Sequence, residues 1–167
     1  MISLGIDNRT LARQVALKAI ERGITLATAE SCTAGLVAHL LGLTSGVSAA
    51  LLGGIVAYAN SAKRDLLDVP EHVLERFGAV SEPVALAMAE GARLRFGAGL
   101  TVAITGVAGP DGGTAEKPVG LVYIATRGAR IQRCERFLFH GDRAENVDSA
   151  ARQALLMLRD ALSTDPT

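Results

Sequence analysis

Residues 24–42 read ITLATAESCTAGLVAHLLG, and the hydrophobic pattern of the chain changes twice within them. The first six, 24–29, are apolar residues and threonines, which predict a short buried strand. A polar turn follows at 30–35, and the next apolar stretch predicts a helix that ends near Gly42. A strand that passes through a tight turn into a helix is the unit from which α/β proteins are built.

The segments on either side of this unit continue the alternation. Upstream, Thr10 is expected to cap a helix that runs to about Glu21 and stops at Gly23. The other predicted strands are 51–58, 100–105, 119–126 and 131–140, the last two joined by a hairpin-like turn at 127–130. The other predicted helices are 60–66, 70–77 with Pro70 in its first turn, a long one capped by Ser81 with Pro83 in its first turn, and one from 141 or 142 to about 162.

This order of elements predicts a three-layer α/β/α fold with a mixed, mostly parallel sheet and a late antiparallel hairpin. We expect one domain over residues 1–167, with a frayed tail at 163–167. Because 49% of the residues are hydrophobic but only 4% are aromatic, the core is expected to consist of Ala, Val, Leu and Ile.

Charge and cysteine content restrict the function classes. The formal net charge is zero and no basic stripe is present, which argues against nucleic acid as the main partner. The same neutrality gives little charge repulsion between copies, so we expect a homo-oligomer. Cys32 and Cys134 fit no CxxC spacing, and the first residues do not read as an export signal. We therefore expect reduced thiols and a cytoplasmic protein.

One stretch resembles a membrane-spanning segment in its composition. Residues 31–62 contain no Asp, Glu, Lys or Arg. Five glycines interrupt it, however, and Thr44, Ser45 and Ser48 lie at its centre. Two shorter buried elements joined by a Ser/Gly loop explain the stretch better than one continuous helix. We expect no contact with membranes.

Three polar or glycine-rich segments each follow a predicted strand, which places them at the carboxyl edge of the sheet, where ligands bind in α/β proteins. The first is residues 30–35, ESCTAG. Ser31 could attack a carbonyl carbon while the neighbouring backbone amides hold the oxyanion. The simpler alternative, which the spacing alone favours, is that Ser31 or Thr33 caps the following helix.

The second segment, residues 58–63, reads YANSAK, and the third, residues 105–114, reads TGVAGPDGGT. A lysine at position 63 could serve as a general base if it were buried beside a serine, although a solvated lysine is the commoner case. Glycines in the third segment could free backbone amides to bind an anion, whereas the plain alternative is a connecting loop.

Other catalytic patterns are missing from the sequence. His39, His72 and His140 are scattered, and no acidic cluster has the spacing of metal ligands. We therefore expect no metal, no cofactor and no Ser–His–Asp triad.

Six motifs in this order resemble the CinA C-terminal domain family, whose members are nicotinamide-nucleotide amidases, and the resemblance covers nearly the whole chain. They are AESCTAG (29–35), GIVAYANSAK (54–63), GAVSE (78–82), ITGVAGP (104–110), KPVG (117–120) and GDR (141–143). The chain departs from the family pattern at Ala34 and Asp111, where glycine is usual, and at Asp148, where arginine is expected.

The resemblance implies that the chain hydrolyses nicotinamide mononucleotide to nicotinate mononucleotide and ammonia. It also implies that Ser31 is the nucleophile and Lys63 the base, and that Tyr58 and Ser48 relay protons or orient Lys63. The residues implied around the oxyanion are Glu30, Cys32, Thr33, Ala34 and Gly35. Those implied around the nucleotide and its phosphate are Thr105, Gly106, Ala108, Gly109 and Arg143.

Two alternatives stay open. The chain could be a non-catalytic nucleotide-binding or regulatory module of the same fold, which Asp111 and Asp148 leave possible. It could also be an amidase with Cys32 as nucleophile, although a small buried residue in the first turn of a helix is the simpler interpretation of that cysteine.

Overall fold

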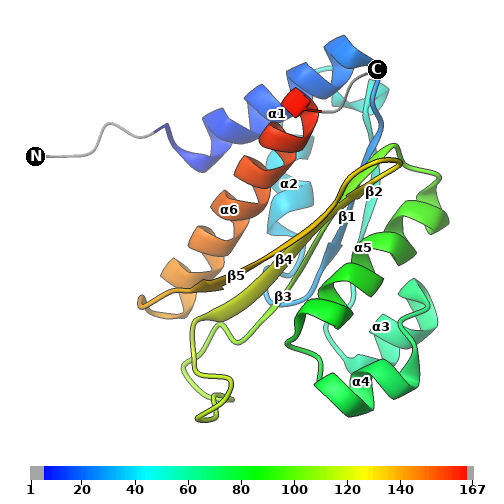
Figure 1. Ribbon diagram of the computed structural model, residues 1–167. Coiled ribbons are helices and arrows are strands. Elements are labelled where there is room, and N and C mark those ends of the chain that lie inside the picture. The colour runs from blue at the N-terminus through cyan, green and yellow to red at the C-terminus, as the bar shows by residue number, and fades with distance from the viewer. Residues whose placement is uncertain (1–5, 165–167) are drawn as a thin grey trace, which may run out of the picture.

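The computed structural model describes residues 6–164, which form a sheet of five strands with helices on both faces (Figure 1). The strands are β1 (Leu26–Glu30), β2 (Leu51–Val56), β3 (Leu100–Gly106), β4 (Leu121–Gly128) and β5 (Gln132–Leu138). The helices are α1 (Asn8–Arg22), α2 (Leu36–Gly42), α3 (Asn60–Leu67), α4 (Glu71–Phe77), α5 (Glu82–Phe96) and α6 (Arg143–Thr164), with a single 3-10 turn, η1 (Val47–Ala49), before β2.

The sheet has the order β2-β1-β3-β4-β5. β1 lies parallel to both β2 and β3, whereas β4 runs antiparallel to β3 and to β5. This topology confirms the predicted α/β/α architecture, the mixed sheet and the late hairpin. Because β1, β2 and β3 point the same way, the chain leaves all three strands at one edge of the sheet, and the three predicted site segments begin there.

Each face of the sheet has its own core, as the two groups of helices in Figure 1 show. The face under α1, α2 and α6 presents large side chains, among them Leu26, Val102 and Ile124. The face under α3, α4 and α5 presents alanines instead, such as Ala29 and Ala103. Small side chains on this second face let α5 pack close to the sheet, which fixes the helices that carry the site.

The ends of several helices differ from the predicted ones. Thr10 does not cap α1: the cap is Asp7, whose carboxylate accepts a hydrogen bond from the Thr10 backbone N–H at 2.7 Å. Pro70 stands at the N-cap of α4, one residue before its first turn. Ser81 stands at the N-cap of α5 as predicted, but its hydroxyl donates to the carbonyl of Gly78.

Part of the predicted C-terminal tail is helical, and the apolar stretch at 31–62 is divided among several elements. Residues 163 and 164 belong to α6, and residues 165–167 of the predicted tail lie outside the described residues. Within residues 6–164, no helix is both long and apolar enough to cross a membrane.

Gly91 is the point of closest approach between α5 and the end of α3. A Cβ atom at this position would lie 2.0 Å from the carbonyl oxygen of Leu67. We expect Gly91→Ala to lower the free energy of unfolding by about 3 kcal/mol, because the two helices must separate to admit the methyl group. Urea unfolding measures this change. Gly42→Ala is the control: no atom lies within 4 Å of the added Cβ, so the variant should match or exceed wild-type stability.

Candidate active site

Ser31 directly follows β1 and begins a tight turn that leads to α2. Its backbone N–H donates to the carbonyl of Ile104 at 2.9 Å, which continues the pairing between β1 and β3 by one residue. Its carbonyl accepts from the N–H of Ala34 at 3.0 Å and closes the turn. The side chain is only 7% exposed. The alternative that Ser31 or Thr33 caps α2 is wrong, because the N-cap residue is Gly35.

The carboxylate of Glu30 holds this turn in shape. It accepts hydrogen bonds from five donors, which are the hydroxyls of Thr28 and Thr33 and the backbone N–H groups of Gly35, Val37 and Ala38. Glu30 is 1% exposed, and both of its carboxylate oxygens accept hydrogen bonds from within the chain. Rather than facing a ligand, Glu30 neutralises the amino end of α2 and orders the turn that carries Ser31.

Glu30→Ala is expected to lower the free energy of unfolding by about 3 kcal/mol or more, because buried N–H and hydroxyl donors lose their acceptor. The exposed Glu21, at the end of α1, supplies the matched control. Glu21→Ala should change stability by no more than about 0.5 kcal/mol. Equal effects of the two substitutions in urea unfolding would show that the Glu30 contacts do not stabilise the turn.

Lys63, in the first turns of α3, lies against Ser31. Its Nζ atom is 3.0 Å from the Oγ atom of Ser31 and donates to the carbonyl oxygens of Ala57 and Tyr58, each at 2.9 Å. The residue is 1% exposed, so the alternative of a solvated lysine is wrong. Ala57 and Tyr58 follow β2 and Ser31 follows β1, so the parallel pairing of these strands brings the serine and the lysine together.

Burial shifts the pKa values of Lys63 and Cys32 in opposite directions. Removal from water lowers the pKa of the Lys63 ammonium below its ordinary 10.5, and its charge interaction with Cys32 opposes this shift. Burial raises the pKa of the Cys32 thiol to about 12, and the negative charge of Glu30 adds to the rise. At neutral pH Cys32 is therefore a protonated thiol, a poor nucleophile.

The turn offers two backbone donors beside Ser31. Among the described residues, the N–H groups of Cys32 and Thr33 have no hydrogen-bond partner, whereas those of Ala34 and Gly35 are occupied. Ala34 adopts a left-handed conformation, with φ of 50°. A left-handed backbone favours glycine, so Ala34 holds a conformation that the turn requires and that alanine adopts at a cost.

A cavity of about 600 Å³ lies where the loop after β3 meets the start of α6. It is lined by Ala108, Pro110, Val119, Gly141, Asp142, Arg143 and Ala144. The guanidinium of Arg143 donates to the carbonyl of Gly109 at 2.6 Å and to the hydroxyl of Tyr58 at 2.8 Å. Since the carbonyl of Tyr58 binds Lys63, these contacts connect the cavity to the Ser31–Lys63 pair.

Not all of the residues predicted to surround the nucleotide line this cavity. Ala108 lines the cavity, but the hydroxyl of the buried Thr105 donates to the carbonyl of Ala79. A Cβ on Gly106 would lie 2.8 Å from the carbonyl oxygen of Leu121, so Gly106 allows two backbones to approach, and it is not among the residues that line this cavity. Asp111 is exposed in the loop.

Ser48 and Asp148 lie away from the site within one chain. Ser48 is exposed in η1, before the start of β2, and thus at the opposite edge of the sheet from Ser31. The structure does not bring it to Lys63. The carboxylate of Asp148 accepts from the side chain of Asn8, where α1 meets α6.

Asn146 is a site residue that no sequence pattern indicated. It is 1% exposed, and its side-chain amide donates to the carbonyl of Ala108 at 3.0 Å and accepts from the N–H of Gly141 at 3.0 Å. It therefore fixes two walls of the cavity to each other. Its polar character on an otherwise apolar helix face was the only available signal. No group of three or more His, Cys, Asp or Glu residues that could hold a metal ion occurs in the described part of the chain.

Comparisons with known proteins agree with this fold. The sequence profile of the CinA C-terminal domain matches residues 8–162. A CinA-like protein from Geotalea uraniireducens is 49% identical in an alignment of 166 positions that covers 95% of this chain but only 40% of that protein. The chain therefore spans only part of the length of this curated relative.

Two solved structures match over their whole length. The competence/damage inducible protein CihA from Agrobacterium tumefaciens is 43% identical, with a TM-score of 0.92 over 98% of this chain and 100% of that one. The competence damage-inducible protein A from Klebsiella pneumoniae is 34% identical, with a TM-score of 0.93 over 96% of this chain and 100% of that one. Profile, sequences and structures together show that the chain belongs to the CinA C-terminal domain family.

Proposed function

We propose that this chain hydrolyses the carboxamide of nicotinamide mononucleotide to nicotinate mononucleotide and ammonia. The observation that carries the proposal is the buried contact of 3.0 Å between Lys63 Nζ and Ser31 Oγ. The two carbonyl oxygens that accept from Nζ take two N–H groups of a neutral amine, which leaves its lone pair to face the serine hydroxyl. That is the arrangement a general base needs.

The chemistry follows from these positions. Neutral Lys63 takes the proton of Ser31 as Oγ bonds to the carboxamide carbon, and the negative charge that forms on the amide oxygen is held by the N–H groups of Cys32 and Thr33. Protonated Lys63 then gives its proton to the departing nitrogen, and the C–N bond breaks to release ammonia. Water, deprotonated by Lys63, attacks the resulting ester. Lys63 returns this proton to Oγ as the C–O bond breaks, which frees Ser31 and an acid that ionises to the carboxylate product.

The cavity beside Arg143 is the proposed binding site of the ribose phosphate. A planar guanidinium such as that of Arg143 can bind phosphate oxygens in a bidentate manner. The cavity also adjoins the amino end of α6, a helix of 22 residues whose dipole favours an anion. Tyr58 holds Arg143 through its hydroxyl and Lys63 through its carbonyl, so it positions both groups.

The phosphate contact predicts a substrate preference. Arg143→Ala is expected to lower kcat/KM for nicotinamide mononucleotide about 10- to 100-fold, the range of one or two hydrogen bonds to a charged group. The wild type should prefer the mononucleotide strongly over nicotinamide riboside, and Arg143→Ala should leave activity on the riboside nearly unchanged. Steady-state kinetics on both substrates checks this. Equal loss on both would mean that Arg143 acts on the shape of the site and not on the phosphate.

Incubation of the purified chain with nicotinamide mononucleotide, followed by measurement of ammonia and nicotinate mononucleotide, tests the proposed activity. Equimolar formation of the two products supports it. The second candidate, a non-catalytic nucleotide-binding module, predicts binding of the mononucleotide without either product. The Ser31–Lys63 contact favours the enzyme, because a module that only binds needs no buried lysine beside a serine.

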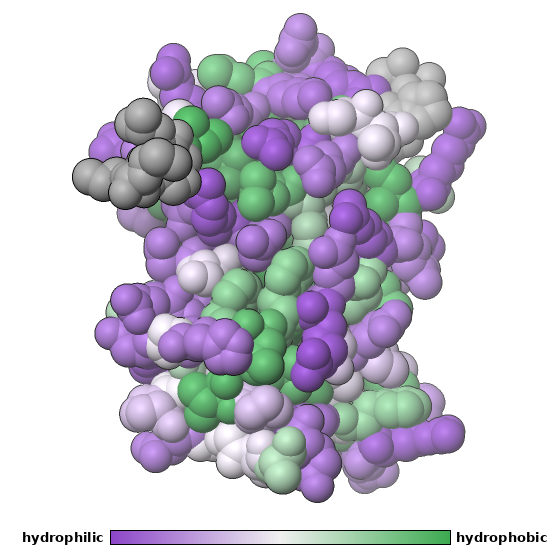
Figure 2. Space-filling view, turned by 60° about the vertical axis from the view of Figure 1, so that its left-hand side comes forward, coloured by the Kyte–Doolittle hydropathy of each residue, from purple (hydrophilic) through white to green (hydrophobic). Residues whose placement is uncertain are grey.

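Cytoplasmic localisation and assembly into homo-oligomers belong to the same proposal. The zero net charge supports assembly, and so do exposed apolar side chains along the edge strand β2, such as Leu52 at 42% and Val56 at 48% exposed. On the face that Figure 2 shows, hydrophobic residues gather in a band through the middle and hydrophilic residues surround them.

A further inference from the structure

Tyr58 carries the most exposed ring among the Tyr and Phe side chains of residues 6–164. It is 55% exposed, and the only other exposed one in this part of the chain is Phe77, at 39%. The ring contacts within the same residues join Phe137 to Phe139 and Arg76 to Phe77, so neither an aromatic nor a cationic side chain covers the face of Tyr58. A single exposed ring is common on protein surfaces. Tyr58 differs because both of its ends are fixed.

The two halves of the candidate site hold the two ends of Tyr58. Its carbonyl oxygen accepts from the Nζ atom of Lys63 at 2.9 Å, and the same Nζ atom lies 3.0 Å from the Oγ atom of Ser31. Its hydroxyl accepts from the guanidinium of Arg143 at 2.8 Å, and Arg143 lines the cavity of about 600 Å³. The side chain of Tyr58 therefore extends from the serine–lysine pair to this cavity.

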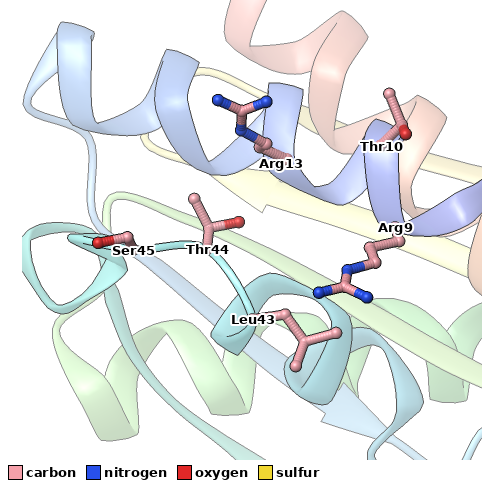
Figure 3. Close-up of a pocket in the computed structure, with 6 residues that line it drawn as sticks. All are labelled: Arg9, Thr10, Arg13, Leu43, Thr44 and Ser45. Carbon is pink, nitrogen blue, oxygen red and sulfur yellow. The ribbon is translucent and has the colours of Figure 1, made fainter.

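A second hollow, of about 280 Å³, lies between α1 and the loop after α2 and lacks such a connection (Figure 3). Its lining residues include no aromatic side chain; they are Arg9, Thr10, Arg13, Leu43, Thr44 and Ser45. The loop follows the carboxyl end of α2, whereas Ser31 precedes its amino end. The cavity that Tyr58 joins to Ser31 is therefore the better place for a substrate of the serine.

A nicotinamide nucleotide that fills the candidate site brings its ring to Tyr58. The carboxamide and the ribose are attached to the same pyridinium ring, and the proposed function puts the carboxamide at Ser31 and the phosphate at Arg143. The glycosidic bond to the ring nitrogen gives this ring a positive charge. Glu30, next to Ser31, is buried and already accepts five hydrogen bonds, so its carboxylate does not serve the cation. The face of a tyrosine ring attracts cations, and that of Tyr58 is open.

We propose that the Tyr58 ring stacks on the pyridinium ring of the substrate and selects pyridinium carboxamides over their uncharged dihydropyridine forms. This inference rests on the proposed function and adds the class of ring that the site accepts. The hydroxyl contact with Arg143 holds the ring in place before the substrate binds, which lowers the cost of ordering it. The expected preference for the charged ring is about tenfold in Kd, which is the size of one cation–π contact partly removed from water.

The Ser31→Ala variant allows this preference to be measured without turnover. Calorimetric titration gives the Kd of nicotinamide mononucleotide and of its reduced dihydropyridine form, which has the same ribose phosphate but an uncharged ring. Tyr58→Leu, added to Ser31→Ala, should reduce the preference from about tenfold to within about twofold. Tyr58→Phe is the matched control. It should keep most of the preference, because it retains an aromatic face and the lost hydroxyl contact affects both ligands alike. An unchanged preference in the Tyr58→Leu variant would overturn the proposal.

Tyrosine fluorescence reports the ring contact directly, because the chain has two tyrosines and no tryptophan. When Tyr123→Phe is added to Ser31→Ala, Tyr58 is the only emitter. Nicotinamide mononucleotide should then quench its emission saturably, since a pyridinium ring in contact accepts an electron from the excited tyrosine. With Tyr58→Phe added instead, Tyr123 in β4 is the emitter, and only the loss caused by light absorption of the ligand is expected. Calorimetric binding without quenching of Tyr58 would overturn this inference alone, whereas absence of binding would contradict the proposed function as well.

Discussion

Ser31→Ala is expected to lower kcat/KM for nicotinamide mononucleotide by about 10⁴-fold or more, because loss of the attacking atom removes the covalent route and leaves only binding and the oxyanion donors. The fold should persist. Lys63 keeps its two carbonyl partners in the variant, so the free energy of unfolding should change by no more than about 1 kcal/mol. Stopped assays of ammonia release measure the first quantity, and urea unfolding measures the second.

Cys32→Ala is the matched control, since it alters the next residue in the same turn. The burial that raises the pKa of the Cys32 thiol to about 12 argues against a thiolate nucleophile, so this variant should stay within about tenfold of wild type. The opposite pattern, with Ser31→Ala active and Cys32→Ala inactive, would assign the chemistry to the cysteine.

Lys63→Arg and Lys63→Met are both expected to lower kcat by about 10³-fold or more. Arginine keeps the charge but cannot give up its proton near neutral pH, and methionine fills the buried space without a base. Lys63→Ala is a poorer test, because it leaves a hole and two carbonyls without their donor. If Lys63→Arg kept substantial activity, the lysine would supply only positive charge.

The same lysine sets the pH dependence. Burial lowers its pKa below 10.5, and only the neutral amine acts as a base. The rate should therefore rise with pH as one group loses its proton below the ordinary range of lysine, and it should level off above that pKa. A pH profile that falls over this range would exclude a neutral Lys63 as the active form.

Much of the fold was predictable because the hydrophobic pattern of each strand is strong. Residues 100–105 are apolar residues and threonines and form most of β3, and the polar turn at 30–35 separates β1 from α2 as expected. Helix ends were harder to predict. Thr10 and Asp7 are both good caps, and only the backbone geometry, which depends on tertiary packing, decides that the carboxylate of Asp7 is used.

The candidate site was less predictable from local sequence patterns than the fold was. Spacing alone favoured a cap for Ser31 and a solvated position for Lys63, and the family resemblance reversed both interpretations. The structure supports that reversal through parallel pairing of β1 with β2, a long-range contact that no local pattern encodes. The resemblance implied a place for Glu30 around the oxyanion, and no sequence pattern indicated its contacts with the turn. Its carboxylate turns inward, since the amino end of α2 offers three backbone donors at hydrogen-bonding distance.

The central claim is that Ser31 forms a covalent acyl intermediate, and trapping with hydroxylamine tests it most directly. When hydroxylamine is added during turnover of nicotinamide mononucleotide, it should divert part of the product to the hydroxamate, in proportion to its concentration, and Ser31→Ala should form none. Formation of nicotinate mononucleotide by the wild type without any hydroxamate, at every hydroxylamine concentration, would show that water attacks the amide directly and would contradict the account.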